Sequence, residues 1–165
     1  MLDKLLTFFK GSGAGRVAPG AAGQADANAP LDPAHAELIA GDERRNGRAW
    51  SAAARHYRAY LKDQPEDFAI WVQLGHALKE DHRLTDADDA YGEARRLRPA
   101  NADLLLNHGH LKKLRGNLAD AAALYMASAE IQPGSDVMLE LQNPLIQHQL
   151  SESQRRWLQA RRPRP

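Results

Sequence analysis

The chain has 165 residues, with 22 lysines and arginines against 21 aspartates and glutamates, and it contains no cysteine. This length predicts one small domain with appendages, and the missing thiols exclude disulfide bonds and thiolate chemistry. The formal charge of +1 gives no indication of specific nucleic-acid binding. No stretch approaches the roughly 18 apolar residues that span a membrane, so we expect a cytoplasmic protein that is at most peripheral to a membrane-associated complex.

Residues 1–10, MLDKLLTFFK, are predicted to form a short amphipathic helix. Its large apolar side chains share one helical face: Leu2, Leu5, Leu6 and Phe9. This face can fold back on the rest of the chain, dock on a partner protein, or lie on a membrane surface, and the three hypotheses stay open. Residues 11–31 follow as a stretch rich in glycine, alanine and proline, which predicts a flexible linker.

A period of 34 residues runs through the centre of the chain, in the windows 34–67, 68–101 and 102–135. Each window holds two runs of apolar residues at helical spacing. A fixed period of this length predicts three antiparallel helix pairs that stack, because no pair can bury its apolar face alone. Like residues recur at like positions: glycine at position eight (Gly41, Gly75, Gly109), tyrosine at position 24 (Tyr57, Tyr91, Tyr125) and proline at position 32 (Pro65, Pro99, Pro133).

Short local signals predict where these helices begin and turn. Asn46-Gly47 and Gly116-Asn117 predict turns inside the first and third pairs. Thr85 and Asp88 have the spacing of a capping box, with aspartate in place of glutamate, at the start of the second helix of the middle pair. An N-cap residue follows each of the spaced prolines: Asp67, Asn101 and Ser135.

Residues 136–161 are predicted to cap the open end of the stack with further helices. The segment begins like a fourth repeat, with Leu139 at position four, until Asn143-Pro144 interrupts it. Residues 162–165 end a basic tail, in which five arginines from Arg155 onwards either bind an acidic surface or stay solvated. The apolar residues of the cap are expected to cover the third pair: Leu145, Ile146, Leu150, Trp157 and Leu158.

The repeated positions resemble the tetratricopeptide repeat, most closely in the middle window, where eight positions are in register: Trp71, Leu74, Gly75, Leu78, Ala87, Tyr91, Ala94 and Pro99. The resemblance implies an all-α, right-handed solenoid whose first helices line a concave groove that binds a protein or peptide segment. The stretch from IWVQLGHALKE to LNHGHLKKLRGN is also similar to bacterial tetratricopeptide segments that precede glycosyltransferase domains. Such segments recruit protein substrates or complex partners.

Carried over by position, the family's groove residues are Asp42, Arg45, Gln73, His76, Lys79, Asn107, His110 and Lys113. Stacking would place the two amides side by side, where they could hold the backbone of an extended peptide, since an amide both donates and accepts hydrogen bonds. It would likewise align the cations, which favour carboxylates on the ligand. Leu38 and Asp42 stand where family members that bind chaperone Glu-Glu-Val-Asp tails have lysine and asparagine, so such tails are not the expected ligand.

No residue pattern predicts catalysis, a cofactor or a metal site. Asp86-Ala-Asp88-Asp89 resembles acidic motifs that bind metal, but it opens a predicted helix, where carboxylates favour the positive end of the macrodipole. His108 and His110 point apart on a helix, and the row of His76 with His110 offers only two ligands. We therefore predict a non-catalytic adaptor or scaffold. The alternative is a structural assembly subunit that self-associates through repeat faces or residues 1–10.

Overall fold

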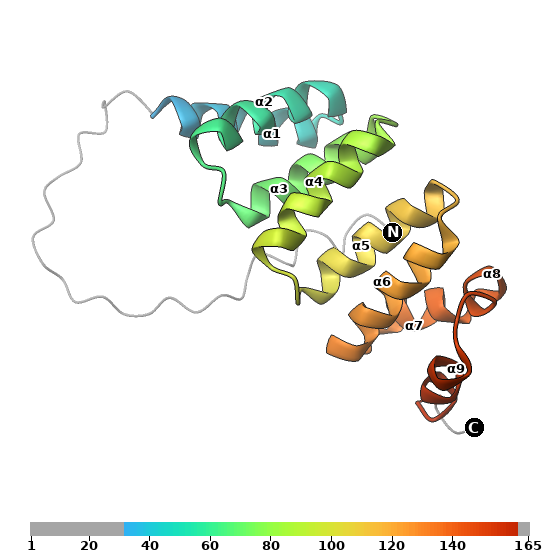
Figure 1. Ribbon diagram of the computed structural model, residues 1–165. Coiled ribbons are helices and arrows are strands. Elements are labelled where there is room, and N and C mark those ends of the chain that lie inside the picture. Colours follow the sequence, from blue (N-terminus) through green and yellow to red (C-terminus); the bar gives the residue numbers. More distant parts are fainter. Residues whose placement is uncertain (1–31, 162–165) are drawn as a thin grey trace, which may run out of the picture. The chain divides into compact units, whose positions relative to one another are not determined.

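The computed structural model describes residues 32–161, which form nine α-helices and no strand (Figure 1). The predicted helix at 1–10, the linker at 11–31 and the end of the basic tail at 162–165 lie outside these residues. Within residues 32–161, none of the helices combines the length and the apolar character needed to cross a membrane.

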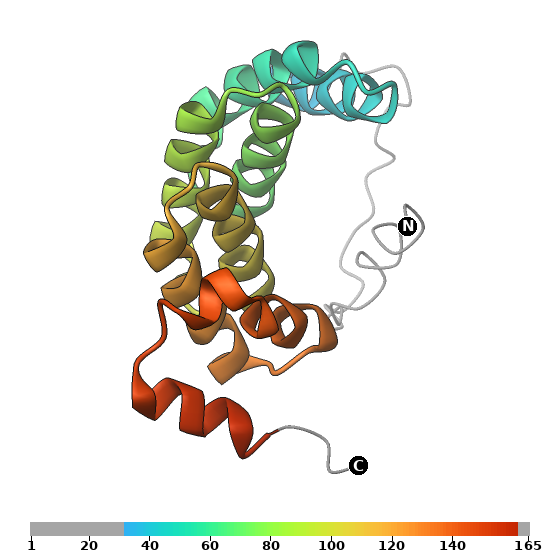
Figure 2. The same cartoon turned by 90° about the vertical axis from the view of Figure 1, so that its right-hand side faces the viewer.

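Six helices form three antiparallel pairs, which confirms the predicted all-α solenoid. The second helix of each pair packs against the first helix of the next one, so the pairs stack in chain order (Figures 1 and 2). Helices α2, α4 and α6 each end two residues before one of the spaced prolines. The pairs are α1 (Pro33–Asn46) with α2 (Trp50–Asp63), α3 (Phe68–Glu80) with α4 (Leu84–Leu97), and α5 (Ala102–Leu114) with α6 (Leu118–Ile131).

Each pair is closed by a tyrosine ring that lies on a glycine. A β-carbon added to Gly75 would lie 2.6 Å from the ring of Tyr91, which is closer than real β-carbons approach other atoms. The first and third pairs repeat this contact, at 2.7 Å for Gly41 and 2.5 Å for Gly109. All three tyrosines are at most 1% exposed. The spacing of glycine and tyrosine in the sequence therefore records one helix–helix contact made three times.

Two of the three predicted N-caps are confirmed. The side chain of Asp67 accepts hydrogen bonds from two backbone N–H groups of α3, and that of Asn101 accepts one from α5. The third is wrong, because Gly134 caps α7 while Ser135 is its first helical residue. A glycine can take the extended backbone of an N-cap without a side-chain bond, so the serine is not needed there.

The turns within pairs place the same position, the fifteenth, in the left-handed region. Arg48 has φ 56°, His82 has φ 59° and Gly116 has φ 78°. Turns are thus present where they were predicted, but Gly47 has φ −79° and is not the left-handed residue of its turn. Only the third pair uses the glycine that this conformation favours, so two turns hold a strained side-chain-bearing residue.

Three short helices follow the third pair: α7 (Ser135–Gln142), α8 (Pro144–Gln147) and α9 (Glu152–Gln159). Four of their residues, together with Leu150 in the connection between α8 and α9, are buried in one cluster with side chains of α6. Leu145, which was expected to join this cluster, is 60% exposed, and Leu139 at position four is 70% exposed. A four-residue helix, α8, follows α7 where a complete repeat has a second helix of 14 residues. It is too short to cover Leu139. The buried residues are Val137, Leu141, Ile146, Leu150 and Leu158.

Candidate protein-binding face

The eight predicted groove residues lie on the first helices of the three pairs. They recur every three positions, which places them on one side of each helix. We call this side the first-helix face. Its members are Asp42 and Arg45 on α1, Gln73, His76 and Lys79 on α3, and Asn107, His110 and Lys113 on α5.

The electrostatics of the two histidines shows that the three helices bring these side chains together. Burial lowers the pKa of His76, and the charges of Lys79 on its own helix and Arg45 on α1 lower it further. Burial also lowers the pKa of His110, against the opposing charge of Glu140, and the lysines of α5 and α3 add to the decrease. Both imidazoles are therefore neutral at pH 7 and present a donor and an acceptor.

Each of the two histidines packs edge-on against an aromatic ring, which comes from the preceding pair for His76 and from the same pair for His110. The ring of His76 lies edge-on to Trp50 with ring centroids 5.7 Å apart, and that of His110 lies edge-on to Tyr125 at 5.5 Å. Their side chains are 31% and 33% exposed. Each ring is thus fixed on one side by an aromatic residue and open to solvent on the other. Trp50 was not anticipated, because it precedes the matched positions of the second helix.

Every cation of the face has a carboxylate of the same chain beside it. Arg45 Nη1 lies 3.5 Å from Asp42, and Lys79 Nζ lies 3.3 Å from Glu80. Lys113 Nζ lies 2.5 Å from Glu140 of α7. The face therefore presents ion pairs rather than a bare row of positive charge, and an acidic ligand would compete with these partners.

Glu140 contacts His110 and Lys113 of this face and was missed by sequence reasoning. It occupies position five of the interrupted fourth repeat, a position that the family's groove uses. The leucine recognised at position four, one residue earlier, was the signal that could have identified it.

The two amides of the face make no hydrogen bond to any other residue between 32 and 161. Gln73 and Asn107 occupy equivalent positions in consecutive repeats and are half-buried. In the part of the chain that the structure describes, neither side chain has a hydrogen-bond partner, whereas the neighbouring cations do. The amides are the groups of this face that are most available to the backbone of a ligand.

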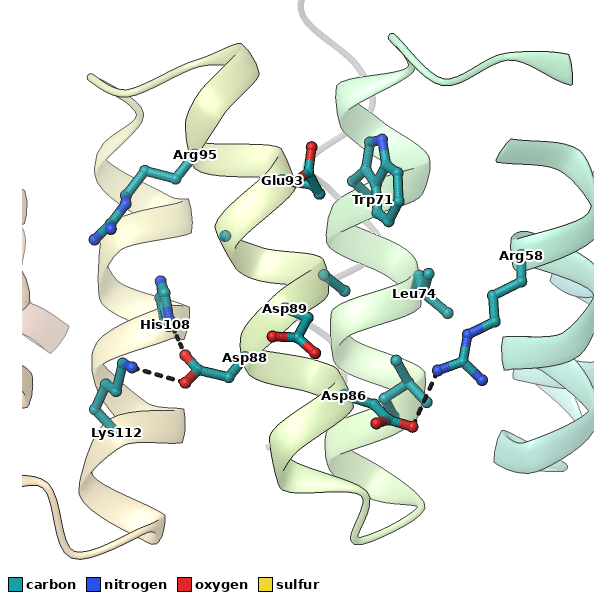
Figure 3. Close-up of a pocket in the computed structure, with 13 residues that line it drawn as sticks. Arg58, Trp71, Leu74, Asp86, Asp88, Asp89, Glu93, Arg95, His108 and Lys112 are labelled. Carbon is teal, nitrogen blue, oxygen red and sulfur yellow. Dashed lines mark hydrogen bonds and ion pairs between the residues drawn. The ribbon is translucent and has the colours of Figure 1, made fainter. Parts of the chain in front are cut away.

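A hollow of about 550 Å³ lies away from this face, around α4 (Figure 3). Its charged side chains bind one another: Asp86 accepts a hydrogen bond from Arg58 of α2 at 3.0 Å, and Asp88 accepts from His108 of α5 at 2.6 Å and from Lys112 at 2.8 Å. These bonds join α4 to the repeats on both sides. The acidic motif thus has a structural role at the interfaces between repeats.

The predicted capping box is wrong, because Arg83 is the N-cap of α4 and Asp88 lies in the following turns. Burial raises the pKa of Asp88, but hydrogen bonds from Lys112 and His108 outweigh it, so the pKa is lowered overall. His108 itself is 3% exposed, and burial lowers its pKa despite the carboxylate. His110 turns instead toward Glu140 at 3.3 Å, so the two histidines diverge, as predicted.

Three stacked pairs of 13- and 14-residue helices, closed by a ring on a glycine, define the tetratricopeptide-repeat fold. No protein-family model and no curated protein sequence matches the chain. Its structure is similar to the first TPR domain of Spaghetti (RPAP3) bound to the HSP90 peptide SRMEEVD, with a TM-score of 0.64, 16% identity and coverage of 72% of this chain and 94% of that one.

Two further solved structures agree. The TPR2B domain of yeast Sti1 in complex with pHsp70 has a TM-score of 0.58 at 19% identity, covering 69% of this chain and 93% of that one. The crystal structure of MamA has a TM-score of 0.64 at 16% identity, covering 77% and 75%. At these identities the likeness establishes the fold, and the similarity to glycosyltransferase-associated segments stays a prediction.

Proposed function

We propose that this protein is a non-catalytic adaptor that binds an extended protein segment across the first-helix face. The observation that carries the proposal is the pair of amides, Gln73 and Asn107, which lie at equivalent positions and have no hydrogen-bond partner within residues 32–161. An extended segment presents backbone N–H and C=O groups along its length, and stacked amides can pair with both. The half-exposed rings of His76 and His110 lie on the same helices and add flat contact surface.

Two solved structures of the same fold are complexes, one with an HSP90 peptide and the other with pHsp70. They support a peptide as the class of ligand here. They do not favour the same peptides, because Leu38 and Asp42 occupy the positions where the chaperone-binding clamp has lysine and asparagine. Asp42 is moreover already engaged, accepting a hydrogen bond from Tyr57 at 2.8 Å.

Exposed apolar side chains support the alternative of self-association. Leu114 at the end of α5 is 62% exposed, and the uncovered Leu139 and Leu145 lie at the C-terminal end of the stack. A second copy could cover these residues. Light scattering over a concentration series tests the alternative, since a monomer at high concentration would exclude it.

The adaptor proposal is tested by removing the two amides together. The full chain and the Gln73→Ala/Asn107→Ala variant would be used to capture partners, and a captured segment would then be synthesised as a peptide. We expect the variant to bind it more weakly by about 0.5–1.5 kcal/mol per lost hydrogen bond. The matched control is Gln64→Ala/Gln159→Ala, which removes two exposed amides elsewhere. Equal affinity of all three proteins would refute the proposal.

A further inference from the structure

Glu140 is acidic at a position, the fifth, that is apolar in the three complete repeats. The equivalent residues in the three complete repeats are Leu38, Val72 and Leu106. Glu140 also lies in the last turn of α7, where the helix macrodipole disfavours a negative charge. Its side chain is nevertheless 21% exposed only, because it reaches Lys113 at 2.5 Å through one oxygen and His110 at 3.3 Å through the other.

The hydroxyl of Tyr125, beside the same histidine, has no acceptor. Tyr125 is 0% exposed and its hydroxyl is one of two buried side-chain polar atoms without a partner in residues 32–161. In the first repeat the equivalent Tyr57 donates to the carboxylate of Asp42, at position nine. In the third repeat position nine is His110. The repeat therefore shows that a carboxylate fits the end of this tyrosine, and its third copy supplies none from the same position.

Glu140 lies near this hydroxyl without accepting from it. The ring of Tyr125 lies 5.5 Å from that of His110, centroid to centroid, and Glu140 lies 3.3 Å from the same histidine. Burial raises the pKa of Tyr125, and the negative charge of Glu140 raises it further. Three groups that can donate hydrogen bonds to a carboxylate thus converge next to one internal carboxylate, at the C-terminal end of the first-helix face.

We propose that His110, Lys113 and Tyr125 form a subsite for one carboxylate of the bound segment, and that Glu140 occupies this subsite in the free protein as an internal competitor. The inference rests on the adaptor function proposed above. Binding exchanges one carboxylate for another: the ligand accepts from the Lys113 ammonium and the Tyr125 hydroxyl, and Glu140 turns into solvent. An acidic ligand consequently gains little from the lysine until Glu140 is removed.

The test uses the full chain and two defined peptides. N-acetyl-hexaglutamate amide carries side-chain carboxylates only, and an N-acetylated Gly-Ser hexapeptide with a free C-terminus carries one main-chain carboxylate. Affinities would be measured by NMR titration of the backbone amides. We expect Glu140→Gln to tighten binding about two- to fivefold for the peptide that carries the kind of carboxylate, side-chain or C-terminal, that the subsite accepts. The control is Glu152→Gln, which makes the same charge change at an exposed site in α9.

Two further variants separate a ligand subsite from a brace for α7. Lys113→Gln and Tyr125→Phe, each added to Glu140→Gln, should reverse the gain in affinity, and Tyr125→Phe keeps the ring on its glycine. Equal affinities of Glu140→Gln and Glu152→Gln would overturn the proposal. So would a lowered melting temperature of Glu140→Gln with no gain in affinity. These results leave the adaptor function standing if the captured segment still depends on Gln73 and Asn107.

Discussion

Two substitutions can replace the polar pair between the second and third repeats by the apolar pair that lies between the first and second repeats. Asp88 and His108 occupy the positions that Ala54 and Leu74 fill one repeat earlier, and the apolar pair is at most 2% exposed. Asp88→Ala removes the acceptor of the His108 Nε2–H group and the carboxylate that binds two cations. The double substitution Asp88→Ala/His108→Leu reproduces the earlier apolar pair.

The expected magnitude follows from burial. A buried imidazole left without a partner costs about 1–3 kcal/mol. The two cations, Lys112 and Arg115, are 17% and 27% exposed and can turn to solvent, so their loss of a partner adds less than about 1 kcal/mol. We expect Asp88→Ala to lower the free energy of unfolding by about 2–3 kcal/mol. The double variant should lie within about 1 kcal/mol of the unaltered protein, because apolar residues often replace buried ion pairs without loss.

Urea unfolding followed by circular dichroism measures four free energies of unfolding: those of the unaltered protein, Asp88→Ala, His108→Leu and the double variant. Together they give the coupling energy between the two sites. The control is Asp89→Ala, an exposed neighbour on the same helix, which should change stability by less than about 0.5 kcal/mol. A double variant as unstable as Asp88→Ala, or one whose loss is the sum of the two single losses, would refute the reasoning that the pair replaces an apolar contact.

Three further predictions concern packing and pH. Gly75→Ala should lower the free energy of unfolding, measured by thermal unfolding, by about 1–3 kcal/mol, because the added β-carbon meets a tyrosine ring. Gly92→Ala, where the added β-carbon meets open space, should raise it by about 0.5–1 kcal/mol. Equal effects of the two substitutions would contradict this reasoning. Ile146→Ala, at a site 0% exposed, should cost about 2–5 kcal/mol, whereas the adjacent Leu145→Ala, at a site 60% exposed, should cost little; a reversed order would show that α8 does not anchor the cap. Stability should fall as the pH drops below the ordinary pKa of 6.5 of histidine, because the lowered pKa of His108 lets the unfolded chain bind the proton first. Urea unfolding between pH 5 and 7 gives the free energy of unfolding at each pH, and this free energy should depend less steeply on pH in the His108→Leu variant. An unchanged pH dependence would exclude the contribution of His108.

The features that could be predicted from the sequence are those that the period repeats. Glycine on tyrosine and proline after the second helix recur in all three windows, so each contact is recorded three times. The positions of the candidate face follow from the same register. Helix ends are specified once each, by a single local residue, and there one of the three predicted caps was wrong.

The features that could not be predicted depend on contacts between repeats. Asp88 was interpreted by its neighbours in sequence, as a capping residue, although its partners lie 20 or more residues away on α5. Glu140 lies beyond the last complete window, and its partners His110 and Lys113 lie one repeat earlier on α5. The left-handed position in the turns was obscured because only Gly116 of the three carries the expected residue.

Polar residues at core positions of this solenoid occur in matched pairs. Glu37 at position four bonds to His56 of α2 at 2.7 Å, where the third repeat has the apolar Leu105 and Leu124. Asp88 and His108 are matched across two repeats through the Nε2 atom of the histidine, whereas its buried Nδ1 atom has no partner within residues 32–161. A polar residue at a normally apolar repeat position that bonds to a second such residue stabilises the stack and requires no ligand.

The first-helix face follows a different rule. The amides of Gln73 and Asn107 occupy equivalent positions in two repeats and have no hydrogen-bond partner within residues 32–161. The hydroxyl of Tyr125 likewise lacks a carboxylate such as the one that accepts from Tyr57. Glu140 answers the charge of Lys113 but leaves that hydroxyl unpaired. Buried polar groups are normally satisfied, so the unpaired hydroxyl of Tyr125 is one physical reason to expect a bound segment on this face. The two half-buried amides, which a ligand can bind in place of water, are a stronger reason than the charge of the lysines.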